Sequence, residues 1–334
     1  MHTIPEHLNP KLFDADVEQE PNRKGFGEGL KEAGERDESV VALCADLTES
    51  TQVHLFARAF PNRFTEMGIG EQSMASVASG MAAMGKVPFI ASYAMFSPGR
   101  SWEQVRTTIA YNDSNVKIIG SHAGVSVGPD GATHQAIEDM AIMRVIPRMV
   151  VITPCDVHEA KRATLAAAEY EGPVYIRLAR ENTPVITTKG TPFAIGKAEV
   201  YLHRDEAHEK KVGIIATGII LHNAIIAAKQ LNEAGIGASV MNLATIKPLD
   251  EEAVLAFANE HDVLVTVEEH QAAGGMGSAV VEYLSSIRPT RVTRLGVQDA
   301  FGQSGTQDEL IAFYGIDATT IVSTARALVK RVEN

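Results

Sequence analysis

Short apolar runs alternate with amphipathic stretches along the chain from about residue 24 onward. The runs of the first half cover residues 40–47, 86–92, 115–122, 148–154 and 172–179. Strands buried on both faces of a sheet read as near-continuous apolar runs, and their alternation with helical stretches is typical of βαβ units. The pattern predicts a parallel sheet covered by helices, with Ser50, Ser101 and Asp156 as helix N-caps.

A second block of the same kind follows residues 181–200, a segment rich in Thr, Pro and Gly that reads as a linker. Its predicted strands cover residues 210–218, 237–244, 262–270 and 290–298, and its predicted helices cover residues 221–235, 251–260 and 320–333. We therefore expect an α/β chain with two doubly wound domains. Their predicted spans are residues 20–185 and 195–334, after an N-terminal extension at residues 1–19.

Charge and composition exclude several classes of protein. A net charge of -12 gives no basic surface for nucleic acid. The most apolar stretch, residues 212–228, is interrupted by Thr217, Gly218, His222 and Asn223, so we expect no membrane span. The first 25 residues hold no apolar signal-peptide core, which predicts a cytoplasmic protein.

The two cysteines, Cys44 and Cys155, lie apart in apolar runs. We expect both to be buried structural thiols in a reducing compartment. No His/Cys cluster has the spacing of a metal site, so no metal ligands are predicted on this chain. Gly274–Gly277 (GGMG) lacks the pattern of a phosphate loop and reads as the start of a helix packed closely on a strand.

Polar and aromatic residues follow the predicted strands of the first block. They are Asp46, Glu71, Tyr93, Phe96, His122, Asp130, His134 and Arg180. Taken singly, each has a structural interpretation: Glu71 as a first-turn acid, His134 as a helix cap, Asp130-Gly131 as a turn, and the aromatic residues as core. Ligands of doubly wound sheets collect beyond the carboxyl ends of the strands, so the gathering of these residues favours a binding site there.

Three stretches of the first block carry a family resemblance. They are residues 64–96 (FTEMGIGEQSMASVASGMAAMGKVPFIASYAMF), 121–144 (SHAGVSVGPDGATHQAIEDMAIMR) and 175–182 (YIRLAREN). Together they resemble the pyrimidine-binding domain of transketolase. Residues 241–250, 267–284 and 294–316 resemble the C-terminal domain of the same family.

The resemblance implies thiamine diphosphate as cofactor. By motif, Glu71 is the catalytic glutamate that hydrogen-bonds N1′ of the aminopyrimidine and favours the imino tautomer that forms the ylid; a carboxyl with a raised pKa suits that role. Tyr93 and Phe96 match the aromatic segment that packs on the pyrimidine, and Asp46 matches an aspartate that contacts the cofactor. The next segment, Ser97–Trp102 (SPGRSW), departs from the usual family sequence.

The resemblance also implies a sugar phosphate substrate. Arg23, Ser50, His122 and Arg180 match positions that hold the substrate phosphate. Asp130 and His134 match positions that bind sugar hydroxyls near the reacting carbons, and His134 is expected to act in catalysis. The implied reaction transfers a two-carbon ketol unit from a ketose phosphate to an aldose phosphate, as in the pentose phosphate pathway.

One part of the family's machinery is absent from the sequence. The G-D-G motif with a later Asn, which holds Mg²⁺ and the diphosphate, is missing, because Pro129 precedes Asp130-Gly131 and no suitable Asn follows. The chain thus resembles the C-terminal half of a split transketolase whose N-terminal partner subunit supplies that domain, with an α2β2 heterotetramer expected. The alternatives are half of a deoxyxylulose phosphate synthase, a β subunit of a pyruvate or branched-chain dehydrogenase, and a non-catalytic regulatory subunit.

Overall fold

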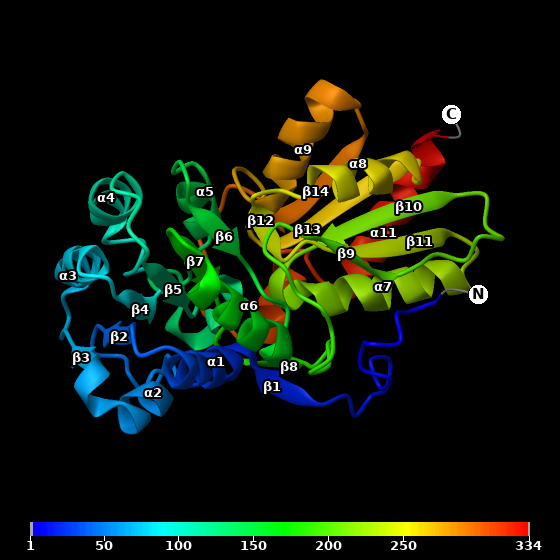
Figure 1. Cartoon of the computed structure of the whole chain (residues 1–334). Coiled ribbons are helices and arrows are strands. Elements are labelled where there is room, and N and C mark those ends of the chain that lie inside the picture. Colours follow the sequence, from blue (N-terminus) through cyan, green and yellow to red (C-terminus); the bar gives the residue numbers. More distant parts are fainter. Residues whose placement is uncertain (1–2, 333–334) are drawn as a thin grey trace.

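Two central sheets organise the chain in the computed structural model, which describes residues 3–332 (Figure 1). The seven strands of the first sheet lie in the order β12 (Thr245–Lys247), β6 (Val150–Ile152), β7 (Val174–Arg177), β5 (Lys117–Ser121), β4 (Val87–Tyr93), β2 (Val40–Cys44) and β3 (Phe64–Glu66). All neighbours are parallel except β12, which is antiparallel to β6.

Helices cover both faces of this sheet. They are α1 (Asn22–Arg36), α2 (His54–Ala59), α3 (Glu71–Ala83), α4 (Trp102–Gln104), α5 (Asp139–Arg144) and α6 (Val157–Glu169), with the 3-10 helices η1 (Pro61–Arg63) and η3 (Val125–Asp130) and the π-helix η2 (Val105–Ala110). Side chains alternate along β2: Val41 and Leu43 pack with Met74 of α3, and Val40 and Cys44 pack in the cluster that holds α1 and α6. Burial on both faces explains why this strand is apolar at every position.

The second sheet has five strands, in the order β14 (Val292–Val297), β13 (Val263–Gln271), β10 (Lys211–Ala216), β11 (Gly237–Asn242) and β9 (Glu199–Leu202). Only β9 is antiparallel to its neighbour. Its helices are η4 (Gly218–Ile220), α7 (Leu221–Glu233), α8 (Glu251–Asn259), α9 (Met276–Ile287), α10 (Gln307–Phe313) and α11 (Ala318–Val332). A two-stranded ladder of β1 (Gln19–Pro21) and β8 (Asn182–Pro184) lies outside both sheets.

The predicted α/β fold is confirmed, with a strand in each of the nine predicted runs and a helix in each of the three predicted helical segments of the second block. Glu333, the last residue of the predicted final helix, lies outside the described residues, as do residues 1–2 of the predicted extension. The GGMG segment starts α9, as predicted, and the Glu268 carboxylate accepts hydrogen bonds from Met276 N and Gly277 N at that helix start.

The predictions for helix caps were partly wrong. Asp156 caps α6, since its carboxylate accepts a 2.8 Å hydrogen bond from Glu159 N. Ser50 does not cap α2, because that helix begins only at His54. Ser101 precedes α4 but makes no side-chain cap bond.

Strand β12 joins the two blocks. It comes from the span predicted as the second domain, yet it pairs with β6 and forms one edge of the first sheet. The two sheets also share an apolar cluster, in which Ile215 and Met241 of the second sheet lie with Val151 and Tyr175 of the first. The two blocks are therefore packed through a continuous core, and the boundary between residues 185 and 195 stays a prediction.

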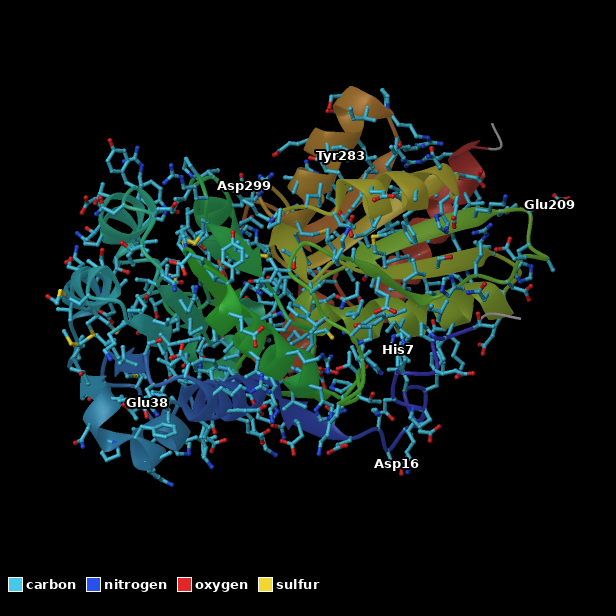
Figure 2. All side chains as sticks on the ribbon, in the orientation of Figure 1. His7, Asp16, Glu38, Glu209, Tyr283 and Asp299 are labelled. Carbon is cyan, nitrogen blue, oxygen red and sulfur yellow. The ribbon has the colours of Figure 1, made fainter. Side chains whose placement is uncertain are left out.

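The N-terminal segment lies against the second block (Figures 1 and 2). Leu8 and Leu12 are buried in the same cluster as α7 and α11, and the Nε2 atom of His7 lies 2.9 Å from Glu199 Oε1. Cys44 and Cys155 are free and buried, as predicted. No helix within residues 3–332 is long and apolar enough to cross a membrane.

Candidate functional site

The carboxyl ends of the parallel strands bring the predicted site residues to one edge of the first sheet. Asp46 follows β2, Glu71 follows β3, Tyr93 ends β4 and His122 follows β5. The chain reverses its direction across the sheet between β2 and β4, because β3 lies on one side of β2 and β4 on the other. Such a reversal opens a crevice at the carboxyl ends of the strands.

Glu71 is the first residue of α3 and is only 2% exposed. Its Oε2 atom accepts a 2.8 Å hydrogen bond from Nη1 of Arg100, whose side chain is 48% exposed. The same guanidinium lies over the ring of Phe96, 4.9 Å from the ring centroid. Arg100 belongs to the SPGRSW segment and was not among the predicted site residues.

The loop that carries Asp46 is held by Glu66, the last residue of β3. The Glu66 carboxylate accepts hydrogen bonds from Asp46 N at 2.7 Å, Thr48 Oγ1 at 2.7 Å and Gly68 N at 3.0 Å. Asp46 itself has a positive φ of 58° and an exposed side chain. Glu66 therefore connects the turn after β2 to the turn that leads into Glu71.

Four rings form an aromatic wall beside Glu71. The imidazole of His122 stacks on Tyr93 with centroids 3.9 Å apart, and Tyr93 lies 6.2 Å from Phe96 at an interplanar angle of 18°. His134 meets Phe96 edge-on at 5.5 Å. Such a wall gives a planar heterocycle a surface on which to pack.

Two arginines lie next to this wall. Arg23 donates from Nε to the carbonyl of Arg180 at 2.9 Å and from Nη1 to the carbonyl of Ser50 at 2.7 Å. Arg180 donates from Nη1 to Asp130 Oδ1 at 2.9 Å. The predicted substrate residues Arg23, Ser50, Asp130 and Arg180 are thus linked by hydrogen bonds.

His122 is held in its neutral form. Burial lowers its pKa to about 3, and the positive charges of Arg23 and Arg180 act in the same direction. His122 thus offers a neutral hydrogen-bonding group next to two guanidinium groups. Anions such as phosphate suit such a set of donors.

The second block holds the loop that carries Asp130 and His134. The carboxylate of Glu269, on β13, accepts a hydrogen bond from Ser126 N, and Gln135 Nε2 donates to the carbonyl of Gln303 at 2.9 Å. Glu269 is 3% exposed and its Oε2 atom has no hydrogen-bond partner. The second block therefore helps to position the binding site, which the sequence did not indicate.

These residues fit an aminopyrimidine better than a metal ion. A buried carboxylate beside an aromatic wall offers a hydrogen-bond acceptor and a stacking surface in one place. Among residues 3–332 there is no group of three or more His, Cys, Asp or Glu side chains arranged to hold a metal ion. The described site residues therefore suit a planar organic ring.

The fold and the site define a two-domain α/β protein with a ligand site at the carboxyl edge of its first sheet. The family model "Transketolase, pyrimidine binding domain" matches residues 19–185, and "Transketolase, C-terminal domain" matches residues 201–321. The chain belongs to the transketolase family, and the predicted resemblance is confirmed.

Two relatives and one solved structure match along most of their own length. A "Putative transketolase C-terminal section" from Methanocaldococcus jannaschii is 44% identical over 90% of this chain and 93% of its own. The "6-deoxy-6-sulfo-D-fructose transketolase subunit SqwH" from a Clostridium species is 38% identical over 96% of this chain and 98% of its own. A solved structure described as "Split gene transketolase, inactive beta4 tetramer" has a TM-score of 0.85 and 40% identity, covering 93% of this chain and 98% of its own.

Proposed function

We propose that the chain is the C-terminal subunit of a two-chain, thiamine-diphosphate-dependent transketolase. It would transfer a two-carbon ketol unit from a ketose phosphate to an aldose phosphate. The observation that carries the proposal is the buried Glu71 carboxylate beside the aromatic wall, next to the linked Arg23 and Arg180. This pairs a pyrimidine site with an anion site along one sheet edge.

Each group on this chain has a part in the proposed reaction. Thiamine diphosphate supplies, when bound, a carbon nucleophile that can attack a ketose carbonyl and keep the two-carbon fragment. Glu71 would hold a proton at N1′ of the aminopyrimidine, while Tyr93 and Phe96 pack against that ring and Asp46 contacts the cofactor. These contacts would fix the orientation of the ring.

The remaining polar groups would bind the sugar phosphate. Arg23, Ser50, His122 and Arg180 would hold the phosphate, since two guanidinium groups and a neutral imidazole all donate hydrogen bonds to oxygen. Asp130 and His134 would bind hydroxyls near the reacting carbons. His134 is edge-on to Phe96, which supports its assignment next to the reacting centre.

A partner subunit would complete the site. The two family models cover the pyrimidine-binding and C-terminal domains, and the partner would supply the diphosphate site and the Mg²⁺ ligands. The names of the Methanocaldococcus jannaschii relative and of the split-gene structure support a two-chain enzyme. We propose an α2β2 heterotetramer, and a reducing compartment such as the cytoplasm suits its two free thiols.

The substrate is a further part of the proposal. The Clostridium relative is named for a sulfosugar, so the sugar differs within the family. The linked arginines support a terminal anionic group, and we propose phosphate, as in the pentose phosphate pathway.

The test is formation of sedoheptulose 7-phosphate from xylulose 5-phosphate and ribose 5-phosphate, with thiamine diphosphate and Mg²⁺. The chain is assayed alone and with a candidate diphosphate-domain partner. Activity only in the mixture supports the proposal, and full activity of the chain alone contradicts the need for a partner. Pyruvate-dependent condensation that exceeds ketol transfer would favour the deoxyxylulose phosphate synthase alternative.

Glu71→Ala in the assembled enzyme tests the catalytic assignment. We expect a loss of activity on the order of 10²-fold or more, because a group needed at the chemical step is removed. Gln72→Ala is the matched control, since Gln72 is the next residue of α3 and its side chain is exposed. Unchanged activity in Glu71→Ala would support the regulatory-subunit alternative.

A further inference from the structure

Arg100 contacts two of the residues that the proposed function assigns to the pyrimidine ring. Its guanidinium donates to Glu71 Oε2 at 2.8 Å and lies over the Phe96 ring at 4.9 Å. A guanidinium is planar and carries N–H donors at its edge, and it stacks on aromatic faces. These are the features that an aminopyrimidine would present to the same two residues.

The Arg100 guanidinium and a bound aminopyrimidine would compete for the Glu71 carboxylate and for the face of the Phe96 ring. In the proposed function, the Glu71 carboxylate attracts a proton that it shares with a ring nitrogen. The positive charge of Arg100, paired with the same carboxylate, opposes a proton at that place. The ring would also pack on the aromatic residue that the guanidinium covers. Glu71 therefore cannot serve the pyrimidine fully while Arg100 stays in place.

The Arg100 side chain can rotate while the backbone of its turn stays fixed. Arg100 N donates to the carbonyl of Phe96 at 3.0 Å, and Gly99 N donates to the carbonyl of Ala94 at 3.0 Å. A Cβ atom at Gly99 would lie 2.1 Å from the carbonyl oxygen of Met95, so the backbone of this turn is tightly packed. The Arg100 side chain is half exposed, whereas Glu71 is buried, so rotation of the arginine side chain is the direct route to an open site.

We propose that Arg100 is an internal stand-in for the pyrimidine, which closes the cofactor site of the free subunit and must release Glu71 before the cofactor engages. This inference rests on the proposed function, since it concerns the same site. It assigns a regulatory and positioning role to the SPGRSW segment, the part of the first block that departs from the family sequence. Arg100 would raise the apparent dissociation constant of the cofactor in the unassembled chain.

The test is calorimetric titration of the purified full chain with thiamine diphosphate and Mg²⁺. Arg100→Met removes the guanidinium and keeps an unbranched side chain. If the guanidinium fills the site for about nine-tenths of the time, its removal lowers the apparent dissociation constant about tenfold. Arg106→Met is the matched control, because Arg106 is an exposed arginine six residues further along, and it should leave the dissociation constant unchanged.

Further variants separate this inference from the proposed function. The tighter cofactor binding of Arg100→Met should disappear in the double variant with Glu71→Gln. The carboxylate that Arg100 would release is then replaced by an amide. Equal or weaker binding by Arg100→Met overturns the role of Arg100 but leaves the pyrimidine site intact. If neither wild type nor Arg100→Met binds alone, the titration is repeated with the partner subunit present, because the partner would supply the diphosphate site. Equal binding by the two complexes then overturns the role of Arg100, and no binding by either complex contradicts the pyrimidine site on this chain.

The fold of each variant is checked with Trp102, the only tryptophan of the chain. Its indole N–H donates to the carbonyl of Ile142 at 2.8 Å and lies two residues after Arg100. An unchanged fluorescence spectrum and an unchanged melting temperature in Arg100→Met indicate that the segment has kept its structure. A changed affinity then reflects the lost guanidinium.

Discussion

The imidazole of His122 stacks on the phenol ring of Tyr93, with ring centroids 3.9 Å apart and planes inclined by 20°. His122 is 3% exposed and has a positive φ of 55°, an uncommon backbone conformation for a histidine. Its Nδ1 atom lies 2.9 Å from Ser121 Oγ. The turn after β5 thus presents a neutral ring close to the positive charges of Arg23 and Arg180.

This relationship predicts how stability depends on pH. His122 has a pKa of about 3 in the folded protein against 6.5 for an ordinary histidine, because burial disfavours the imidazolium. Between these values the unfolded chain binds one more proton than the folded protein at this position. His122 should therefore lower the free energy of unfolding by about 1.4 kcal/mol per pH unit as the pH falls from about 6 to about 4.

The measurement is urea unfolding of wild type and His122→Asn at several pH values. We expect the variant to lose less stability on acidification. The exposed His203 provides the control, since His203→Asn should leave the wild-type pH dependence unchanged. Parallel curves for wild type and His122→Asn would contradict the prediction.

Gly124→Ala should destabilise the protein by about 2 kcal/mol or more. Gly124 has a φ of 85°, and a Cβ atom there would lie 2.3 Å from the Glu269 carboxylate. The methyl group would displace Glu269 from Ser126 N and add backbone strain. Gly85→Ala is the matched control: Gly85 has a φ of 82° with nothing within 4 Å of the added atom, so only strain of about 1 kcal/mol is expected. Equal melting temperatures for the two variants would disprove the contact.

Asp139→Asn should lower the free energy of unfolding by about 3 to 5 kcal/mol. Asp139 accepts hydrogen bonds from Arg177 Nε at 2.9 Å and from Tyr175 Oη at 2.6 Å, and Arg177 donates across the block boundary to the carbonyl of Glu269 at 2.7 Å. The substitution leaves the buried Arg177 charge without its partner. The measurement is denaturant unfolding.

A surface ion pair provides the comparison for Asp139→Asn. Lys31 and Glu35 of α1 lie 3.6 Å apart with both side chains about half exposed. Glu35→Gln should change the stability by less than about 0.5 kcal/mol, because water screens the pair. A similar small change in Asp139→Asn would mean that the Arg177 contact contributes little.

Arg180→Met should raise KM for the sugar phosphate about tenfold or more in the assembled enzyme. A lost hydrogen bond between a guanidinium and a phosphate removes about 1.5 to 3 kcal/mol of binding. Steady-state kinetics with xylulose 5-phosphate measure KM and kcat separately. Arg58→Met, at an arginine whose side chain is 70% exposed, is the control. An unchanged KM in Arg180→Met would place the phosphate elsewhere.

Much of the candidate site could be predicted because its residues directly follow strands. Asp46 and His122 stand at the ends of predicted apolar runs, so the local pattern already brings them to one edge of the sheet. Glu71 opens α3 after a turn that follows β3, and it was the family motif that singled it out. Arg100 could not be predicted in the same way, because its partner Glu71 is 29 residues away and a turn arginine is usually solvated. Its one signal was the unusual SPGRSW segment.

The contribution of the second block was also beyond local patterns. Ser126 and Glu269 are 143 residues apart. Nothing in residues 268–270 (EEH) indicates that the Glu269 carboxylate accepts a hydrogen bond from the backbone of the first block. Strand β12 was missed because it is only three residues long, too short for a periodic pattern. Glu66 was missed because its role depends on backbone N–H groups, which every turn possesses.

The sequence by itself determined the alternation of the main strands with helices, the two blocks and the family of the protein, because periodicity and the residues after each strand are local properties of the chain. Only the tertiary structure decided that β12 completes the first sheet, that Glu269 holds the loop of Asp130 and His134, and that Arg100 forms an ion pair with Glu71. These contacts depend on burial and on hydrogen bonds between segments far apart in sequence. A local sequence pattern carries no information about which distant groups the folded chain brings together and buries.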